Sequence, residues 1–249
     1  LTPYSIWLAT VVVSGISYLS YLLKRYVFHE SGVLVSGIIG GLYSSTATIS
    51  VLARKSRKAS AQEANEYVAA MLLAVSMMFL RFMILILIFS REIFMSIYPY
   101  LLIMSVVAAV VAWFIHSRQR RSKDLSADSE EEDSSNPLEF KVALIFATLF
   151  VIFTVLTHYT LVYAGTGGLN LLSFVSGLSD ITPFILNLLQ NTGSVAVLIV
   201  VACSMQAIIS NILVNMFYAL FFAGKGSKLR PWILGGFGTV IGVNLVLLL

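Results

Sequence analysis

Charged residues are scarce in this sequence, and their scarcity excludes a water-soluble domain. Aspartate, glutamate, lysine and arginine together make up 11% of the 249 residues, whereas 58% are hydrophobic. A soluble domain contains about 25% charged and about 45–50% apolar residues. Intrinsic disorder requires the opposite balance, with few apolar and many charged residues. We therefore expect an integral membrane protein.

A single cysteine, Cys203, excludes an internal disulfide framework and a cysteine-rich metal site. The histidines His29, His116 and His158 are scattered, without the spacing of paired zinc ligands. A nucleophile elbow, a phosphate-binding loop, a dinucleotide fingerprint and paired catalytic carboxylates are also missing. We therefore expect neither an enzyme nor a cofactor. The first residue is Leu1 instead of Met, which indicates a processed chain or a piece of a longer protein.

Basic residues exceed acidic ones by 16 to 12, but their distribution argues against nucleic acid as a partner. They lie in short clusters between long apolar runs, which is how membrane proteins mark their cytoplasmic loops. A polar stretch over 116–139 contains an acidic run at 128–135 that cannot bury itself. We therefore expect a first membrane repeat over 1–115, a cytoplasmic linker over 116–139 and a second membrane repeat over 140–249.

Eight apolar segments divide equally between the two halves. Each approaches the roughly 20 residues that a helix needs to span a bilayer. The segments cover residues 4–23, 33–53, 68–89, 97–115, 141–163, 169–189, 195–222 and 232–249. The fold class that we expect is an all-α, multi-pass integral membrane protein embedded in the lipid bilayer.

The second apolar segment of each half carries a similar run of small and polar residues, which indicates an internal repeat. Three pairs of positions match: Gly41 and Gly177, Ser44 and Asp180, Thr46 and Thr182. Chance similarity between apolar stretches is the alternative, but the cluster recurs in the same segment of both halves.

The positive charges favour one of two topologies. If all eight segments span, the basic loop residues split 9 to 6 between the two sides. If segments 33–53 and 169–189 dip in and return, the split becomes 14 to 1. The positive-inside rule favours the second arrangement and places the basic loops and the linker in the cytoplasm. Each half then has three transmembrane helices and one re-entrant segment, and the repeats are inverted. By length alone, both segments could also span.

Each re-entrant segment needs a break near its middle, and we expect the breaks at Gly40–Gly41 and at Gly177. The limbs then have about 10 residues, or about 15 Å of helix, which is half the hydrocarbon thickness. Non-helical backbone at that depth persists only where it is buried in protein or lines water. Broken segments at matching places in inverted repeats therefore indicate a transport site at the midplane.

Polar residues beside the two breaks are the candidate site. Ser44, Ser45 and Thr46 follow the first break, where hydroxyls either cap free backbone N–H groups or offer oxygens to an ion. Asp180 and Thr182 follow the second break. As an acidic residue within the membrane, Asp180 could cap its half-helix, ligate a metal cation or carry a proton.

Arg81 lies in the middle of an apolar segment, too deep to reach the membrane surface with ease. We expect it to face the protein interior and to neutralise Asp180 or a bound anion. A structural ion pair between the two charges is the plain alternative. Asn211 and Asn215 lie on a neighbouring span and are candidates for the ion pathway together with Gly41, although each asparagine alone suits a polar tie between helices.

Five motifs of the chain carry a family resemblance. They are Pro3-Tyr-Ser-Ile-Trp7, Gly40-Gly-Leu-Tyr-Ser-Ser-Thr-Ala47, Ala53-Arg-Lys-Ser-Arg57, Leu80-Arg81 and Ser176-Gly-Leu-Ser-Asp180. Together they resemble the prokaryotic membrane family known as domain of unknown function 4010, and the resemblance covers essentially the whole chain. Its members often follow an MgtC/SapB-type membrane domain, which implies a missing N-terminal domain here and, by analogy, a link to magnesium or phosphate physiology.

The chain departs from the family pattern at two positions. The family typically has a second acidic residue soon after the position of Asp180 and a lysine at the position of Asn215. This sequence has neither, because Thr182 is the polar residue beyond Asp180 and an asparagine stands at 215. The first departure weighs against a cation site built from two carboxylates, and the second means that an internal positive charge of the family is missing.

We expect a transporter or channel for a small inorganic ion in the cytoplasmic membrane of a bacterium or archaeon. Asp180 and the hydroxyls suit a cation, and the family points to a divalent one. Two helix N-termini with Arg81 suit an anion, and a hydroxyl-lined path would pass a small neutral solute. A non-transporting regulatory or assembly subunit is the rival class. The glycine pairs Gly37–Gly41 and Gly238–Gly242 would allow close packing within a protomer or in a homodimer.

Overall fold

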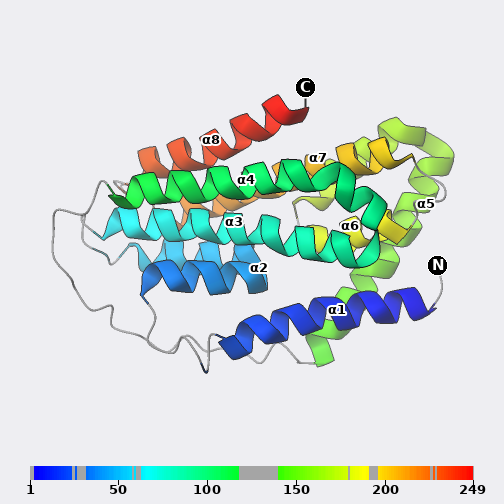
Figure 1. Ribbon diagram of the computed structural model, residues 1–249, viewed down its shortest axis with the longest axis horizontal. Coiled ribbons are helices and arrows are strands. Elements are labelled where there is room, and N and C mark those ends of the chain that lie inside the picture. The colour runs from blue at the N-terminus through cyan, green and yellow to red at the C-terminus, as the bar shows by residue number, and fades with distance from the viewer. Residues whose placement is uncertain are drawn as a thin grey trace.

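The computed structural model contains eight helices and, within the residues that it describes, no strand (Figure 1). It describes residues 3–23, 26, 32–57, 59, 63–117, 140–178, 180–190, 196–224, 227 and 229–248. The helices are α1 (Pro3–Leu22), α2 (Val33–Lys55), α3 (Ala64–Phe89), α4 (Arg91–Ser117), α5 (Phe140–Ser176), α6 (Ile181–Gln190), α7 (Val197–Ala223) and α8 (Arg230–Leu248). By length and composition, six of them are long and apolar enough to cross a membrane: α2, α3, α4, α5, α7 and α8. Helix α1 is a shorter apolar helix by the same measure. The prediction of an all-α, multi-span membrane protein is therefore confirmed.

Helix α3 lies at the centre of the bundle because large apolar side chains cover several of its sides. Its 26 residues contain neither glycine nor proline, so the helix runs without interruption. Met71, Phe79 and Leu85 are fully buried. The hydroxyl of Ser76 donates a hydrogen bond of 2.9 Å to the backbone carbonyl of Ser105 and so ties α3 to α4. The helix thus offers a continuous wall to its neighbours.

Helix α2 is folded back on itself. At Ser44 the backbone is extended, with φ −157° and ψ 107°, and this residue interrupts the helix. A Cβ atom at Gly40 would collide with the side chain of Thr48. In a continuous helix these two residues would lie about 12 Å apart along the axis. The limbs on either side of Ser44 therefore pack against each other as a hairpin, whose two ends lie at the same end of the molecule (Figure 1).

The expected position of this break, Gly40–Gly41, is wrong by a few residues, because both glycines are helical and the break is at Ser44. The glycines serve packing instead. A Cβ atom at Gly41 would lie 2.5 Å from the Cα atom of Ala74, and one at Gly37 would collide with the backbone of α3. These glycines let α2 approach the α3 backbone, so this pair packs within the protomer. The extended conformation at Ser44 is open to any residue.

The second broken segment is divided between α5 and α6. Helix α5 bends at Gly165, where φ is 59° and ψ is −149°, a backbone conformation that favours glycine. The sequence predicts separate helices over 141–163 and 169–189, whereas the structure continues α5 to Ser176 and begins α6 at Ile181. The expected break at Gly177 falls in the gap between these two helices.

Contacts with α7 show that this segment also turns back. The thiol of Cys203 lies 3.4 Å from Oδ1 of Asn170, and Gly177 accepts a hydrogen bond of 3.2 Å from Asn211. The limb before the break therefore runs along α7 into the bundle. Helix α6 returns toward the start of α7, because residues 191–196 alone join the two helices. A connection of that length spans at most about 25 Å.

The two hairpins enter the bundle from opposite ends (Figure 1). Both ends of α2 lie at the same end of the bundle as the end of α7, and α6 leads to the start of α7. Arg57 donates to the carbonyl oxygens of Phe221 and Phe222 in the last turn of α7, and Arg54 lies 4.3 Å from the ring centre of Phe222. The linker residues 118–139 lie outside the described residues, as do five of the basic residues that set the predicted topology: Lys24, Arg25, Lys58, Lys225 and Lys228.

Candidate functional site

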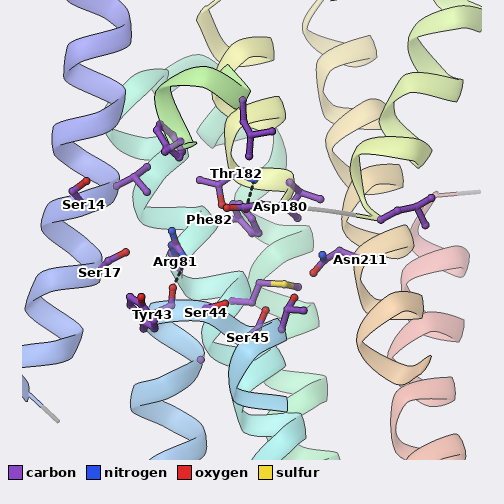
Figure 2. Close-up of a pocket in the computed structure, with 18 of the residues that line it drawn as sticks. Ser14, Ser17, Tyr43, Ser44, Ser45, Arg81, Phe82, Asp180, Thr182 and Asn211 are labelled. Carbon is purple, nitrogen blue, oxygen red and sulfur yellow. Dashed lines mark hydrogen bonds between the residues drawn. The ribbon is translucent and has the colours of Figure 1, made fainter. Parts of the chain in front are cut away.

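The tips of the two hairpins meet at a polar cavity of about 360 Å³ (Figure 2). Helices α1, α2, α3, α5, α6 and α7 all contribute to its lining. Eight of the nine candidate residues from the sequence line it: Gly41, Ser44, Ser45, Thr46, Arg81, Asp180, Thr182 and Asn211. The structure thus brings together residues that lie far apart in the chain, while their part in an ion pathway stays a prediction.

Ser44 caps the second limb of α2. Its Oγ accepts a hydrogen bond of 3.3 Å from the backbone N–H of Ala47, three residues further on. An extended backbone with a hydroxyl that accepts from this position is the usual geometry of a helix N-cap. Ser45 and Thr46 begin the limb and line the cavity. The positive end of this short helix is therefore capped by a neutral group.

Arg81 binds the free backbone carbonyl on the other side of the same break. Its Nη1 donates a hydrogen bond of 2.7 Å to the carbonyl of Tyr43, the last residue of the first limb. Its Nε is shielded from solvent and donates no hydrogen bond within the described part of the chain. Figure 2 shows the guanidinium group between the tip of α2 and Asp180. Arg81 thus faces the protein interior, where a charge at this depth in a membrane protein belongs.

Asp180 caps α6 at the second break. Its Oδ1 accepts a hydrogen bond of 2.9 Å from the backbone N–H of Thr182. Pro183 follows in the first turn, where a missing N–H group is harmless. On the other side of this break, Nδ2 of Asn211 donates to the carbonyl of Gly177 at 3.2 Å. At each break, side chains therefore satisfy backbone groups on both sides.

The two charged groups in the cavity do not form a direct ion pair. No nitrogen of Arg81 lies within 4.0 Å of a carboxylate oxygen of Asp180, although both line the same cavity. Each charge is instead bonded to a backbone group at a helix end. The alternative considered from the sequence, a structural ion pair between Arg81 and Asp180, is therefore absent from this structure.

Asn215 is the one candidate that does not line the cavity. Its Nδ2 donates a hydrogen bond of 3.2 Å to Oδ1 of Asn211, one turn earlier on α7. Through this bond it orients Asn211, which in turn holds the carbonyl of Gly177. Asn215 thus stabilises the second break indirectly, through Asn211.

Sequence reasoning missed four polar residues of the lining: Ser14, Ser17, Tyr43 and Tyr218. Ser14 and Ser17 are three residues apart, so they share one face of α1. That spacing was the available signal, but serines are common within spanning helices and carry little weight alone. Tyr218 lies near the end of its predicted segment, where membrane proteins often place tyrosine. Tyr43 belongs to the motif Gly40–Ala47, but an uncharged tyrosine there does not by itself indicate a site.

Metal ligands are few in and around the cavity. Among the described lining residues, Asp180 is the one carboxylate. In the same part of the chain, no group of three or more His, Cys, Asp or Glu side chains could hold a metal ion. A protein site for Ca²⁺ takes about 6–8 oxygen ligands, several of them carboxylates. Apart from Asp180, the polar side chains of the described lining are hydroxyls, the amide of Asn211 and one guanidinium, and the role of Asp180 as a metal ligand stays a prediction.

The fold and the cavity define the class of this protein: a helical, multi-span membrane protein with two half-length hairpins that meet at a polar cavity. A family model described as "Domain of unknown function (DUF4010)" matches residues 11–223, and the chain belongs to that family. The resemblance inferred from the motifs is therefore confirmed. The chain is also similar to an uncharacterized protein of Aquifex aeolicus (strain VF5), with 25% identity over 199 residues, 79% of this chain and 85% of that protein. No solved structure matches the chain.

Proposed function

We propose that this protein moves a small inorganic ion across the cytoplasmic membrane of a bacterium or archaeon. The observation that carries the proposal is the meeting of two half-length hairpins at one polar cavity. Backbone that leaves the helical conformation within a bilayer is costly unless it is buried or lines such a cavity. Paired broken helices near the midplane are a common way in which transporters build a binding site.

An inverted repeat accounts for the arrangement of the hairpins. Ser44 and Asp180 occupy matching positions in the two halves, and each caps the limb that follows a break. We propose that α1, α3 and α4 span the membrane in the first repeat, and that α5, α7 and α8 span it in the second. Arg54 and Arg57 then mark the cytoplasmic end, in line with the positive-inside rule.

Ion flux into and out of liposomes tests the proposal. Purified protein is reconstituted into liposomes loaded with potassium chloride, potassium nitrate, potassium phosphate or magnesium sulfate. Valinomycin carries the balancing current for the anions and a proton carrier does so for the cations. We expect at least one of these ions to leave faster than it leaves protein-free liposomes, and the release is followed with ion-selective electrodes. If none of the ions moves faster than in the protein-free control, the proposed transport is wrong.

A cysteine variant connects the flux with the cavity. On a Cys203→Ser background, Thr46→Cys places a thiol in the cavity lining. Thr239→Cys places a matched thiol on an exposed position of α8. A thiol reagent should block the flux through the first variant and leave the second unchanged. An equal response of the two variants would mean that the ion does not pass this cavity.

A further inference from the structure

The charges around the cavity bear on the kind of ion, provided that the proposed transport is correct. Among the described lining residues, Arg81 is the one cationic side chain and Asp180 the one anionic side chain. The other titratable side chains in that lining are the phenols of Tyr43 and Tyr218. The kind of ion therefore depends on which of these two charges is less fully offset by other groups of the protein.

The carboxylate of Asp180 is committed to α6. It accepts the N–H of Thr182 at 2.9 Å and stands at the N-terminus of the helix. That end carries about half a positive elementary charge, which the carboxylate offsets. Pro183 contributes no N–H group to the same turn. About half of the negative charge of Asp180 is thus offset where it stands, and the start of α6 keeps no net positive character.

Arg81 keeps donor capacity that the described chain does not use. A guanidinium group has five N–H donors in a fixed plane. Nη1 donates to the carbonyl of Tyr43, while the shielded Nε donates to no group in the described part of the protein. A buried donor of a charged group is costly to leave unbonded. Arg81 lines the cavity through the rest of its guanidinium group, since the shielded Nε has almost no accessible surface. An anion in the cavity would accept from these cavity-facing donors and supply the opposite charge.

The second limb of α2 adds positive character next to Arg81. Its cap is the neutral hydroxyl of Ser44, which accepts over a long distance of 3.3 Å. Among the described residues, no carboxylate caps this limb, in contrast to the start of α6. The hydroxyls of Ser45 and Thr46 belong to the same turn, line the cavity and are able to donate to an anion.

We propose that the cavity binds small inorganic anions, held by Arg81 and by the first turn of the second limb of α2. In this arrangement Asp180 is a helix cap and not a cation ligand. Chloride, nitrate and phosphate all fit within about 360 Å³. The proposal rests on the proposed transport function and adds the sign of the charge that is moved.

Ion selectivity in liposomes separates this inference from the proposed function. In one arm, valinomycin carries the balancing potassium current while chloride, nitrate and phosphate release is measured. In the other arm, valinomycin is left out and a proton carrier balances the charge while magnesium entry is followed with a trapped dye and potassium release with an electrode. Release of at least one of these anions, without movement of the two cations, supports the inference. Movement of cations alone overturns it but leaves the proposed function standing. Movement of neither overturns both.

Variants at the two charges test the assignment of roles. Arg81→Gln should abolish nitrate flux and remove the rise in Tm that nitrate or phosphate produces in detergent, relative to gluconate. Asp180→Asn should keep both, because asparagine caps a helix as well as aspartate does. The reverse result, with flux lost in Asp180→Asn and kept in Arg81→Gln, would overturn the proposal.

Two milder variants keep the test decisive if Arg81→Gln does not fold. Arg81→Lys retains the positive charge, so weakened but measurable nitrate binding is expected. Thr46→Val removes one hydroxyl at nearly constant shape, which should weaken nitrate binding by about two- to tenfold, the usual contribution of one hydrogen bond. Unchanged nitrate affinity in both variants would show that the anion is not held at this place.

Discussion

The two breaks in the membrane segments are built alike but charged differently. At the first break the carbonyl side meets the cation Arg81, and the N–H side meets the neutral hydroxyl of Ser44. At the second break the carbonyl side meets the neutral amide of Asn211, and the N–H side meets the carboxylate of Asp180. The two charges balance across the cavity, yet each stands at a different break. The cavity is therefore polarised, with its positive part at the tip of α2.

The hairpins also differ in how they pack. The first hairpin packs through its backbone, because Gly37 and Gly41 have no side chains and lie directly against the backbone of α3. The second hairpin packs through its side chains, because nine of the ten residues of α6 are buried. The ring of Phe184, for example, packs against that of Phe153 with 5.7 Å between the ring centres. The first hairpin thus tolerates no added volume, whereas the second depends on the volume that it has.

Gly41→Leu should have the largest effect of any single change. A Cβ atom there would lie 2.5 Å from the Cα atom of Ala74, and a backbone atom cannot move aside as a side chain does. Overpacking costs about 1–3 kcal/mol where side chains can adjust, so we expect a loss of at least about 3 kcal/mol in unfolding free energy. Thermal unfolding in detergent measures it.

Gly238→Leu is the matched control for this substitution. Gly238 is an exposed helical glycine of α8, and nothing lies within 4 Å of its Cβ position. Its Tm should stay close to that of the unchanged protein. Equal losses in the two variants would mean that α2 does not rest on the α3 backbone.

Ser44→Asp would give both breaks the same charged cap and so remove the contrast between them. Aspartate and serine cap helices about equally well, so the fold should survive. The new carboxylate would accept from Arg81 in place of an anion, and nitrate flux should fall by more than about tenfold, given the strength of hydrogen bonds between charged groups. Ser44→Asn keeps the cap without the charge and should retain flux. Similar flux in both variants would contradict the contrast.

Removal of each cap should rank the two breaks by stability. Asp180→Ala loses a charged cap with a hydrogen bond of 2.9 Å, and Ser44→Ala loses a neutral cap with one of 3.3 Å. We expect losses of about 1–2 kcal/mol for the first and about 0.5–1 kcal/mol for the second. Chemical unfolding in detergent compares them, and Asp180→Asn should restore most of the loss. A larger loss in Ser44→Ala would reverse the ranking.

Labelling from each side of the membrane should show that the hairpins enter from opposite faces, with little effect on stability. On a Cys203→Ser background, Gly32→Cys and Arg57→Cys lie at the two ends of α2, whereas Gly167→Cys and Ala196→Cys flank the second hairpin. All four positions are exposed. We expect the first pair to react from one side and the second pair from the other. If the members of a pair react from opposite sides, that segment spans the membrane.

Much of the fold could be predicted because a bilayer demands long apolar segments. Six of the eight helices lie close to the predicted apolar segments, whereas α5 continues through the predicted boundary at 163–169 and α6 covers only the end of segment 169–189. The second break falls near Gly177 as expected. The predicted position of the first break is wrong, because the glycines of this segment do not mark its turn. In this hairpin the glycines serve close contact, and the turn needs only an extended residue with a capping hydroxyl, which many serines could supply.

Most of the site could be predicted for a related reason: polar residues in apolar segments are costly unless something uses them. Arg81 and Asp180 stood out on that ground and do line the cavity. The sequence could not show that Arg81 and Asp180 do not pair with each other. Each is bonded to a backbone group that becomes free only where a helix is interrupted. Ser14 and Ser17 were missed because the face that α1 turns to the cavity depends on tertiary packing.

The hairpins also set an order for membrane insertion during synthesis. A half-length limb beside an extended residue cannot remain alone in lipid, because each unsatisfied backbone group costs several kcal/mol there. The α2 hairpin is followed at once by α3, and the hairpin of α5 and α6 is followed at once by α7. In each case the next helix to emerge from the ribosome is the one that the hairpin packs against. The unit of insertion is thus a hairpin with its following helix, so each half of the chain would enter the membrane as a partly folded body.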